Sequence, residues 1–369
     1  MKMNFRRLIR PALVLVFIYI LLLLGPNAGF DIPKIWASIR ADPKQLLQFL
    51  IIGLANGSIT AIIALGYTMV YGIIELINFA HGDVYMIGVF TSLTTLSLTG
   101  TLNTSDPVHI ILGLVFALIV AIVVCALLNA AVERLAYRRL RNAPRLAPLI
   151  SAIGMSFIIE NIGLIWAGQS WLVPSFGTTG GGAQKNFPDL LSVLMQSFGA
   201  NVNLLANTNI GLRLTIKDLM VIVLAGVLMI GLRFFIQRTT LGKAMRATSQ
   251  NRDAAKMLGI DIDRVISVTF MIGGGLAGAA GLMAGLYNGN AWWFMGFRAG
   301  LDAFTAAVLG GIGNITGAML GGFLIGELAS FSDGYLNSGF THAWVFAVLV
   351  LILVLRPTGL LGEQVGEKA

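Results

Sequence analysis

The sequence contains little charge. Only 11% of its 369 residues are Asp, Glu, Lys or Arg, whereas 56% are hydrophobic. Soluble domains carry about 25% charged residues, so the composition excludes an ordinary soluble domain. Apolar runs of about 20 residues match the thickness of a bilayer's hydrocarbon core. They fall at 11–30, 46–74, 76–98, 108–132, 146–167, 216–236, 265–287, 297–330 and 343–355. We therefore expect an all-α, polytopic membrane helical bundle.

Cysteine and histidine are also scarce. The single cysteine, Cys125, lies within an apolar run, so no disulfide framework or Cys-rich metal site can form. The three histidines, His81, His109 and His342, occur in no H-E-x-x-H motif, and no serine occurs in G-x-S-x-G. The sequence therefore predicts neither a catalytic centre nor a metal site.

Nucleotide-binding motifs are missing as well. The Gly-Lys pair at 242–243 is followed by Ala244, and Gln237 stands where a P-loop requires its first glycine. Gly273, Gly275 and Gly278 fit G-x-G-x-x-G, but they lie within an apolar run rather than after a strand. We therefore expect no cofactor in this chain and read these glycines as helix-packing residues.

The net charge of +8 is concentrated in short segments between apolar runs. Arginines and lysines cluster at the N-terminus, at 133–145 and at 237–264, which predicts that these segments are cytoplasmic rather than bound to nucleic acid. Both termini are then cytoplasmic, and 168–215 becomes an external insertion. The run at 11–30 lacks a convincing cleavage site, so we expect it to be a retained helix.

Two cytoplasmic termini require an even number of crossings. The run at 297–330 is too long for one straight helix, and we expect it to break at Gly310–Asn314. Between eight and ten membrane helices then follow. The predicted organisation is an N-terminal segment with an extra helix (1–45), one membrane domain (46–363) and a short tail (364–369).

Small residues recur at four-residue spacing in two runs, which lets helices approach closely in lipid. The predicted packing glycines are Gly274, Gly278, Gly281, Gly285, Gly313, Gly317 and Gly321. A faint similarity relates "LINFAHGDVYMIG" (76–88) to "LDAFTAAVLGGIG" (301–313). Together these features indicate interrupted helices in an inverted repeat, as in many transporters.

Polar residues inside apolar runs are costly and commonly face a path or the bundle interior. In "NFAHGDVYMIG" these are Asn78, His81 and Asp83, and in the second half they include Thr305 and Asn314. Two hypotheses remain open. The side chains either line a translocation path or satisfy the backbone of a helix break.

The segment "QRTTLGKAMRATSQNRDAAKMLGIDIDRV" (237–265) combines basic residues with small apolar ones. We expect Thr248 or Ser249 to cap a short helix that Gly259 ends. Such a helix suits docking onto another protein, although an ordinary basic loop is the alternative.

Four stretches give a family resemblance: "ALGYTMVYGIIELINFAHGDVYMIG", the 237–265 segment, "LDAFTAAVLGGIGNITGAMLGGFLIGE" and "RPTGLLGE". They resemble the NFAHG-bearing permease subunits of branched-chain amino acid ABC importers, over most of 46–363. The chain departs from the family pattern in its longer 1–45 and 168–215, and in carrying Asp302 where many members carry Lys.

The resemblance implies a bacterial inner-membrane protein with four kinds of partner or ligand. These are a second related permease or a second copy, two cytosolic ATPases that bind ATP and Mg, a periplasmic substrate-binding protein, and an amino acid. Urea or short amides are alternative substrates, and an ATP-independent transporter or channel is a further alternative. By this resemblance, the residues that correspond to the family's coupling helix are Thr240, Leu241, Gly242, Arg246, Ala247, Asn251, Ala254, Ala255, Leu258 and Gly259.

Overall fold

The computed structural model describes residues 31–141, 143–144, 146–173, 180–206 and 211–362. The expected helix at 11–30 and the tail at 364–369 lie outside the described residues. The helices are α2 (Ile32–Ala41), α3 (Pro43–Ile74), α4 (His81–Leu98), α5 (Pro107–Val132), α6 (Leu146–Ala167), α7 (Leu190–Ser197), α8 (Ile216–Arg238), α9 (Thr240–Gln250), α10 (Arg252–Met257), α11 (Ile262–Asn288), α12 (Met295–Gly310), α13 (Ile315–Tyr335) and α14 (Thr341–Leu355). Two short strands, β1 (Lys185–Asn186) and β2 (Asn290–Ala291), pair antiparallel.

Within the described part of the chain, seven helices are long and apolar enough to cross a membrane. They contain α3, α5, α6, α8, α11, α13 and α14. The prediction of a polytopic helical bundle is thus confirmed. The run at 297–330 divides as expected, because α12 ends at Gly310 and α13 begins at Ile315. The run at 76–98 becomes helical only at His81.

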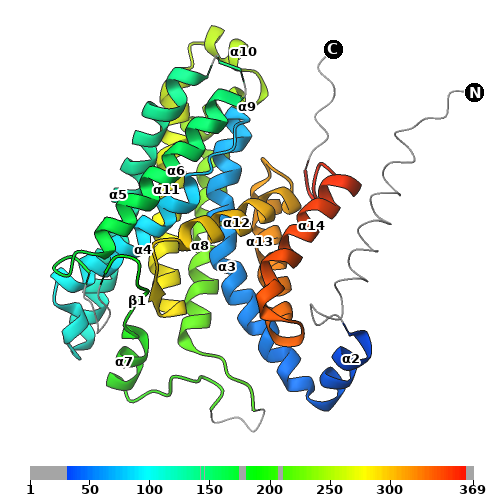
Figure 1. Ribbon diagram of the computed structural model, residues 1–369. Coiled ribbons are helices and arrows are strands. Elements are labelled where there is room, and N and C mark those ends of the chain that lie inside the picture. The colour runs from blue at the N-terminus through cyan, green and yellow to red at the C-terminus, as the bar shows by residue number, and fades with distance from the viewer. Residues whose placement is uncertain (1–30, 142, 145, 174–179, 207–210, 363–369) are drawn as a thin grey trace, which may run out of the picture.

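Helix α3 crosses the middle of the molecule and separates two groups of helices (Figure 1). On one side α4, α5, α6 and α11 pack together, and on the other α12, α13 and α14 do so. The packing partners repeat. Helix α3 packs on α13, and α11 packs on α5 in the same way. Helix α4 contacts α5 and α6, just as α12 contacts α13 and α14. Helices α4 and α12 also contact each other.

The two four-helix units, α3–α6 and α11–α14, run in opposite directions. Arg252 begins α10, which packs on α11, and it donates a hydrogen bond of 2.9 Å to the Ile73 carbonyl at the end of α3. At the opposite end of the molecule, Asn288 at the end of α11 lines one cavity together with Phe49 near the start of α3. The architecture is therefore an inverted repeat of interrupted helices.

Matching breaks connect the first two helices of each unit. The residue that follows α3 is Glu75 (φ 55°), and the residue that follows α11 is Gly289 (φ 68°). Both have left-handed backbone conformations. Connections of equal length, 75–80 and 289–294, then lead to α4 and α12. The predicted similarity between 76–88 and 301–313 is therefore not the structural correspondence, since the break precedes the helix in the first stretch and follows it in the second.

Glycines allow the helices of the two units to approach at their backbones. The first turns of α4 and α12 cross at Gly82 and Gly296, where a Cβ on Gly82 would overlap the Gly296 carbonyl. Gly274 and Gly278 press against α5, Gly281 against α4, and Gly285 against the Phe187 ring, whereas Gly317 and Gly321 press against α12. Gly313 differs from the prediction. It lies in the turn between α12 and α13 with φ 92°, because the chain reverses there.

The closest contact between α3 and α13 provides a stability prediction. A Cβ on Gly326 would overlap the backbone of Gly57. The substitution Gly326→Leu should destabilise the protein by about 1–3 kcal/mol, the usual cost of overpacking, and lower the melting temperature of the purified protein in detergent. Gly226→Leu on α8 is the matched control, since nothing lies within 4 Å of a Cβ built there. An equal loss of stability in both variants would contradict the assigned contact.

Candidate functional site

One face of α3 lines three cavities in succession along the length of the helix. Its residues are Phe49, Ile52, Asn56, Thr60, Ile63, Tyr67, Tyr71 and Glu75, which we name the α3 stripe. Successive members are three or four positions apart, so they share one helix face. The stripe is therefore continuous from one end of the molecule to the other.

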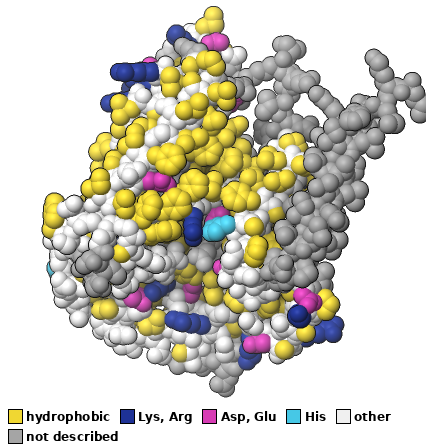
Figure 2. Space-filling model, viewed as in Figure 1, with side chains coloured by type: hydrophobic (Ala, Val, Ile, Leu, Met, Phe, Trp, Pro, Cys, Tyr) yellow, Lys and Arg dark blue, Asp and Glu magenta, His cyan; other side chains and the backbone are white. Residues whose placement is uncertain are grey.

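The cavity at the end nearer the start of α3 has a volume of about 340 Å³ and is named the α14 cavity. It lies between α3, α12, α13 and α14. Its α3 wall includes Ile52, Ile59 and Ile63, and the α12 and α14 walls contribute Asp302 and His342. Figure 2 shows acidic, basic and histidine side chains close together at a hollow in an otherwise largely hydrophobic face.

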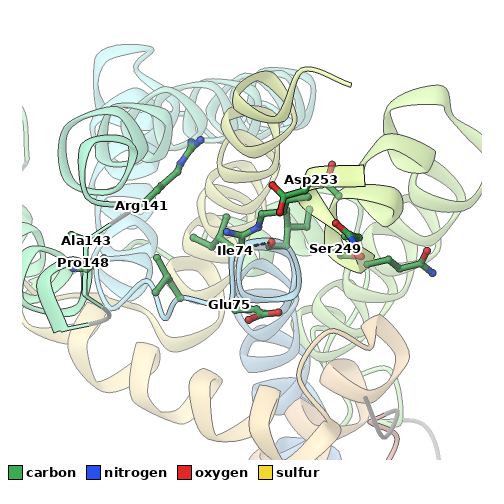
Figure 3. A pocket seen from close by; sticks show the side chains of 13 residues that line it. Ile74, Glu75, Arg141, Ala143, Pro148, Ser249 and Asp253 are labelled. Carbon is green, nitrogen blue, oxygen red and sulfur yellow. Dashed lines mark hydrogen bonds between the residues drawn. The ribbon is translucent and has the colours of Figure 1, made fainter. Parts of the chain in front are cut away.

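A second cavity, of about 450 Å³, lies at the opposite end and is named the α10 cavity. It is enclosed by the end of α3, the residues that precede and begin α6, and the α9–α10 junction (Figure 3). Glu75, Arg141, Ser249, Arg252 and Asp253 give it a polar lining of both charge signs.

Aromatic side chains separate the two larger cavities. Tyr67 and Phe79 each lie 6.2 Å from Phe304, measured between ring centroids, and Tyr67 lies 4.8 Å from His81. A narrow hollow lies at this level, lined by Tyr67, Tyr71, Ile77, Phe304, Ala307 and Ile312. This aromatic group closes the α3 stripe near its middle.

Asn78 is buried in the break between α3 and α4 and is held by a hydrogen-bond network. Its Nδ2 donates to Asn129 Oδ1 (3.1 Å), and its Oδ1 accepts from the Tyr137 hydroxyl (3.2 Å). Asn129 in turn donates to the Phe270 carbonyl on α11 (2.7 Å). Tyr137 also lies 3.0 Å from the Ile77 carbonyl. The network therefore ties the broken backbone to α5 and α11.

His81 and Asp83 occupy the first turn of α4 and are fully buried. Neither ring nitrogen of His81 has a hydrogen bond of normal geometry to the described residues, although the Ile63 carbonyl is close. The ring packs against Gly66 and Tyr67. Asp83 accepts a hydrogen bond from Ser156 on α6 and lies beside α12. Both side chains hold helices together rather than line the three cavities.

The two candidates from the second half also have local partners. Thr305 donates to the Leu301 carbonyl one turn earlier in α12 (2.9 Å). Asn314 caps α13 by accepting from the Gly317 N–H (2.9 Å) and donates to the Leu361 carbonyl (2.8 Å). Of the two earlier hypotheses, this geometry favours the one in which the side chains bond to backbone groups at helix breaks and helix ends. It does not favour the one in which they line a path.

The 237–264 segment folds into two helices at the α10 end. Helix α9 is capped by Thr239 and α10 by Asn251. The expected cap at Thr248 or Ser249 is wrong, because both residues lie inside α9 and donate to their own helix. Gly259 follows α10 with φ 80°, which suits the end of a helix.

The predicted coupling residues divide into two groups. Gly242 and Ala255 are buried, and Leu241 and Ala247 are partly buried. Thr240, Arg246, Asn251, Ala254, Leu258 and Gly259 are exposed. The sequence prediction missed Met257, which is 89% exposed and adjoins Leu258 at 80%. These two side chains form an apolar tip on α10.

A buried ionic cluster, also missed, connects this end of α5 with α11. Glu133 is fully buried and accepts from Ser267 (2.8 Å), Arg138 and Arg141. Arg141 also pairs with Asp263. The basic run at 133–145 indicated a cytoplasmic loop, but sequence alone gave no partner for Glu133.

The Asn78 network provides a second stability prediction. Asn78→Leu leaves the buried Asn129 Oδ1 without its donor, while Tyr137 keeps the Ile77 carbonyl. An unsatisfied buried group costs about 1–3 kcal/mol, so the melting temperature of the purified protein should fall. Asn161→Leu is the control, because the Asn161 amide is exposed on α6 and bonds only its own helix, at the Phe157 carbonyl. If Asn78→Leu has the same melting temperature as the wild type, the network does not hold the break.

Known proteins resemble this chain over most of its length. The family described as the permease component of branched-chain amino acid transport systems matches residues 49–355. The permease BraD of Pseudomonas aeruginosa is 39% identical over 325 residues, which cover 87% of this chain and 97% of that protein. LivH of Escherichia coli K12 shows the same identity and coverage.

A more distant relative is the probable permease LivH of Methanocaldococcus jannaschii. It is 28% identical over 329 residues, which cover 86% of this chain and 92% of that protein. No solved structure matches the chain. The match of the family model and the identity to BraD and LivH, together with the helical bundle, lead to one conclusion: the chain belongs to the family of permease components of branched-chain amino acid transport systems, and is a multi-pass inner-membrane protein.

Proposed function

We propose that the chain is the transmembrane subunit of an ABC importer for branched-chain or related amino acids, with the α3 stripe as its share of the translocation path. One observation carries the proposal: a single helix face connects cavities at opposite ends of the molecule and is closed by aromatic residues between them. The relatives BraD and LivH are named as high-affinity branched-chain amino acid permeases, which supports the same substrate class.

The distribution of positive charge supports an orientation for the path. The α10 end contains the basic segments at 133–145 and 237–264, so the α10 cavity opens to the cytoplasm and the α14 cavity to the periplasm. Both termini then lie on the cytoplasmic side. The segment at 168–215 is on the periplasmic side, where a substrate-binding protein docks.

Helices α9 and α10 contact the ATPases that drive transport. The partners are two cytosolic ATPases, which bind ATP and Mg, since the sequence of this chain has no P-loop motif. A second permease completes the path. The exposed Met257 and Leu258 are apolar side chains at the tip of a segment that lies in water, and such a tip suits insertion into a groove of a partner protein. Arg252, the first residue of α10, then connects this short helix to the end of α3 through its bond to the Ile73 carbonyl.

Affinity purification from the native membrane in mild detergent tests the partner set. We expect two P-loop ATPases and a second permease to co-purify. We also expect the complex in liposomes, with its substrate-binding protein supplied outside, to take up leucine when ATP is enclosed with the ATPases. Recovery of the chain alone, even after gentle crosslinking, together with leucine uptake that needs no ATP, would instead establish a secondary transporter or channel.

A charged substitution at the tip tests the coupling. Leu258→Asp should reduce ATPase co-purification and abolish ATP-dependent uptake, because a carboxylate in an apolar groove loses its hydration. The control is Leu361→Asp, which changes an exposed leucine, 41% accessible, outside the 237–264 segment. Normal ATPase recovery and uptake in Leu258→Asp would show that the α10 tip is not the contact.

A further inference from the structure

The α14 cavity is lined by both aliphatic and polar side chains. Ile52, Ile59 and Ile63 of α3 and Ile325 of α13 face it with aliphatic surface. Asp302 of α12, Asp333 of α13 and His342 of α14 bring charged or titratable groups to the same space. Ligand sites commonly combine an apolar lining with a few polar groups and have volumes of about 300–1,000 Å³. The volume of about 340 Å³ suits one small molecule.

We propose that the α14 cavity is a receiving site for a zwitterionic aliphatic amino acid, in which Asp302 holds the ammonium group and the isoleucines contact the side chain. The inference rests on the proposed function and narrows its substrate class. Urea and short amides carry no ammonium group, so a site of this kind favours amino acids over them.

The Asp302 carboxylate has unused hydrogen-bonding capacity. Asp302 makes one contact among the described side chains, a long one of 3.4 Å to His342 Nδ1, and its side chain is 22% exposed. A hydrogen bond of this length is weak, so an ammonium group can replace it. Arg298, four residues earlier, is not paired with Asp302 but lies over the Trp292 ring, 5.2 Å from its centroid.

The charges near His342 favour a cation. Asp302 and Asp333 line the cavity together with His342, whereas Arg298 is not among the lining residues. Asp333 accepts a hydrogen bond from the Thr341 hydroxyl, which leaves its charge in place. Two carboxylates therefore face the cavity. Clefts lined by charge of one sign concentrate ligands of the opposite sign.

The α3 wall offers a partner for the other end of the zwitterion. The Asn56 side-chain amide makes no hydrogen bond within the described part of the chain and lines the cavity one turn from Ile52 and Ile59. Its N–H groups suit a carboxylate. From Asn56 the α3 stripe continues through Ile63 to the aromatic group, so a molecule bound here already lies on the proposed path.

Charge-selective labelling of the purified complex tests the site directly. Ala329→Cys introduces a thiol on the cavity wall, while the native Cys125 is buried. A cationic methanethiosulfonate should react at least about tenfold faster than an anionic one. Adding Asp302→Asn should reduce that preference severalfold, and millimolar leucine, but not urea, should slow the labelling. Equal rates for both reagents, or equal protection by urea, would overturn the proposal.

Uptake by the reconstituted complex gives a second readout. We expect Asp302→Asn to lower leucine uptake severalfold and Asp302→Glu to restore most of it, with unchanged assembly. The control is Asp189→Asn, because Asp189 pairs with Lys217 at 2.6 Å outside the cavity and asparagine can still cap α7. If the wild type transports leucine and Asp302→Asn transports it equally well, the receiving site is wrong while the proposed function stands. A wild-type complex that does not take up amino acids would instead refute the proposed function.

Discussion

Close approach of helix backbones at glycine is the constraint on which the rest of the structure depends. Lipid tails are as apolar as the side chains, so helices in a bilayer associate through tight packing rather than through burial from water. Gly57 and Gly326 join α3 to α13, Gly278 joins α11 to α5, and Gly82 with Gly296 brings the first turns of α4 and α12 together. These contacts fix the two inverted units against each other, with α3 of the first unit packed on α13 of the second.

The helix breaks follow from the same environment. A broken helix within a membrane exposes backbone groups that no water can satisfy, so neighbouring side chains must do so. Asn78 connects the first break to Asn129 and Tyr137, and Asn314 caps the helix after the turn that contains Gly313. These polar residues are thus engaged in structure, whereas the aromatic members of the α3 stripe lie between the cavities at its two ends.

Several sequence predictions failed where the answer depended on neighbours in space. The glycine pattern indicated close packing but did not show that Gly313 is in a turn. The similarity between 76–88 and 301–313 suggested the repeat in the wrong register, because the true correspondence rests on contacts between helices. Asp302 and Arg298 lie four residues apart in the sequence, yet the structure pairs Asp302 with His342 on α14 and places Arg298 over Trp292.

The sequence by itself determined the class of this protein. Long apolar runs need a bilayer, basic segments between them predict an orientation, and ordered motifs identify the family. Only the tertiary structure decided which residues line a cavity. Ile52, Asn56 and Tyr67 look like ordinary members of an apolar run, and His342 like the end of another. The cavity that Ile52, Asn56 and His342 share exists because α12 and α13 pack against α3 and α14 packs on α12 and α13. Contacts of that kind join residues too distant in sequence for any local pattern to reveal.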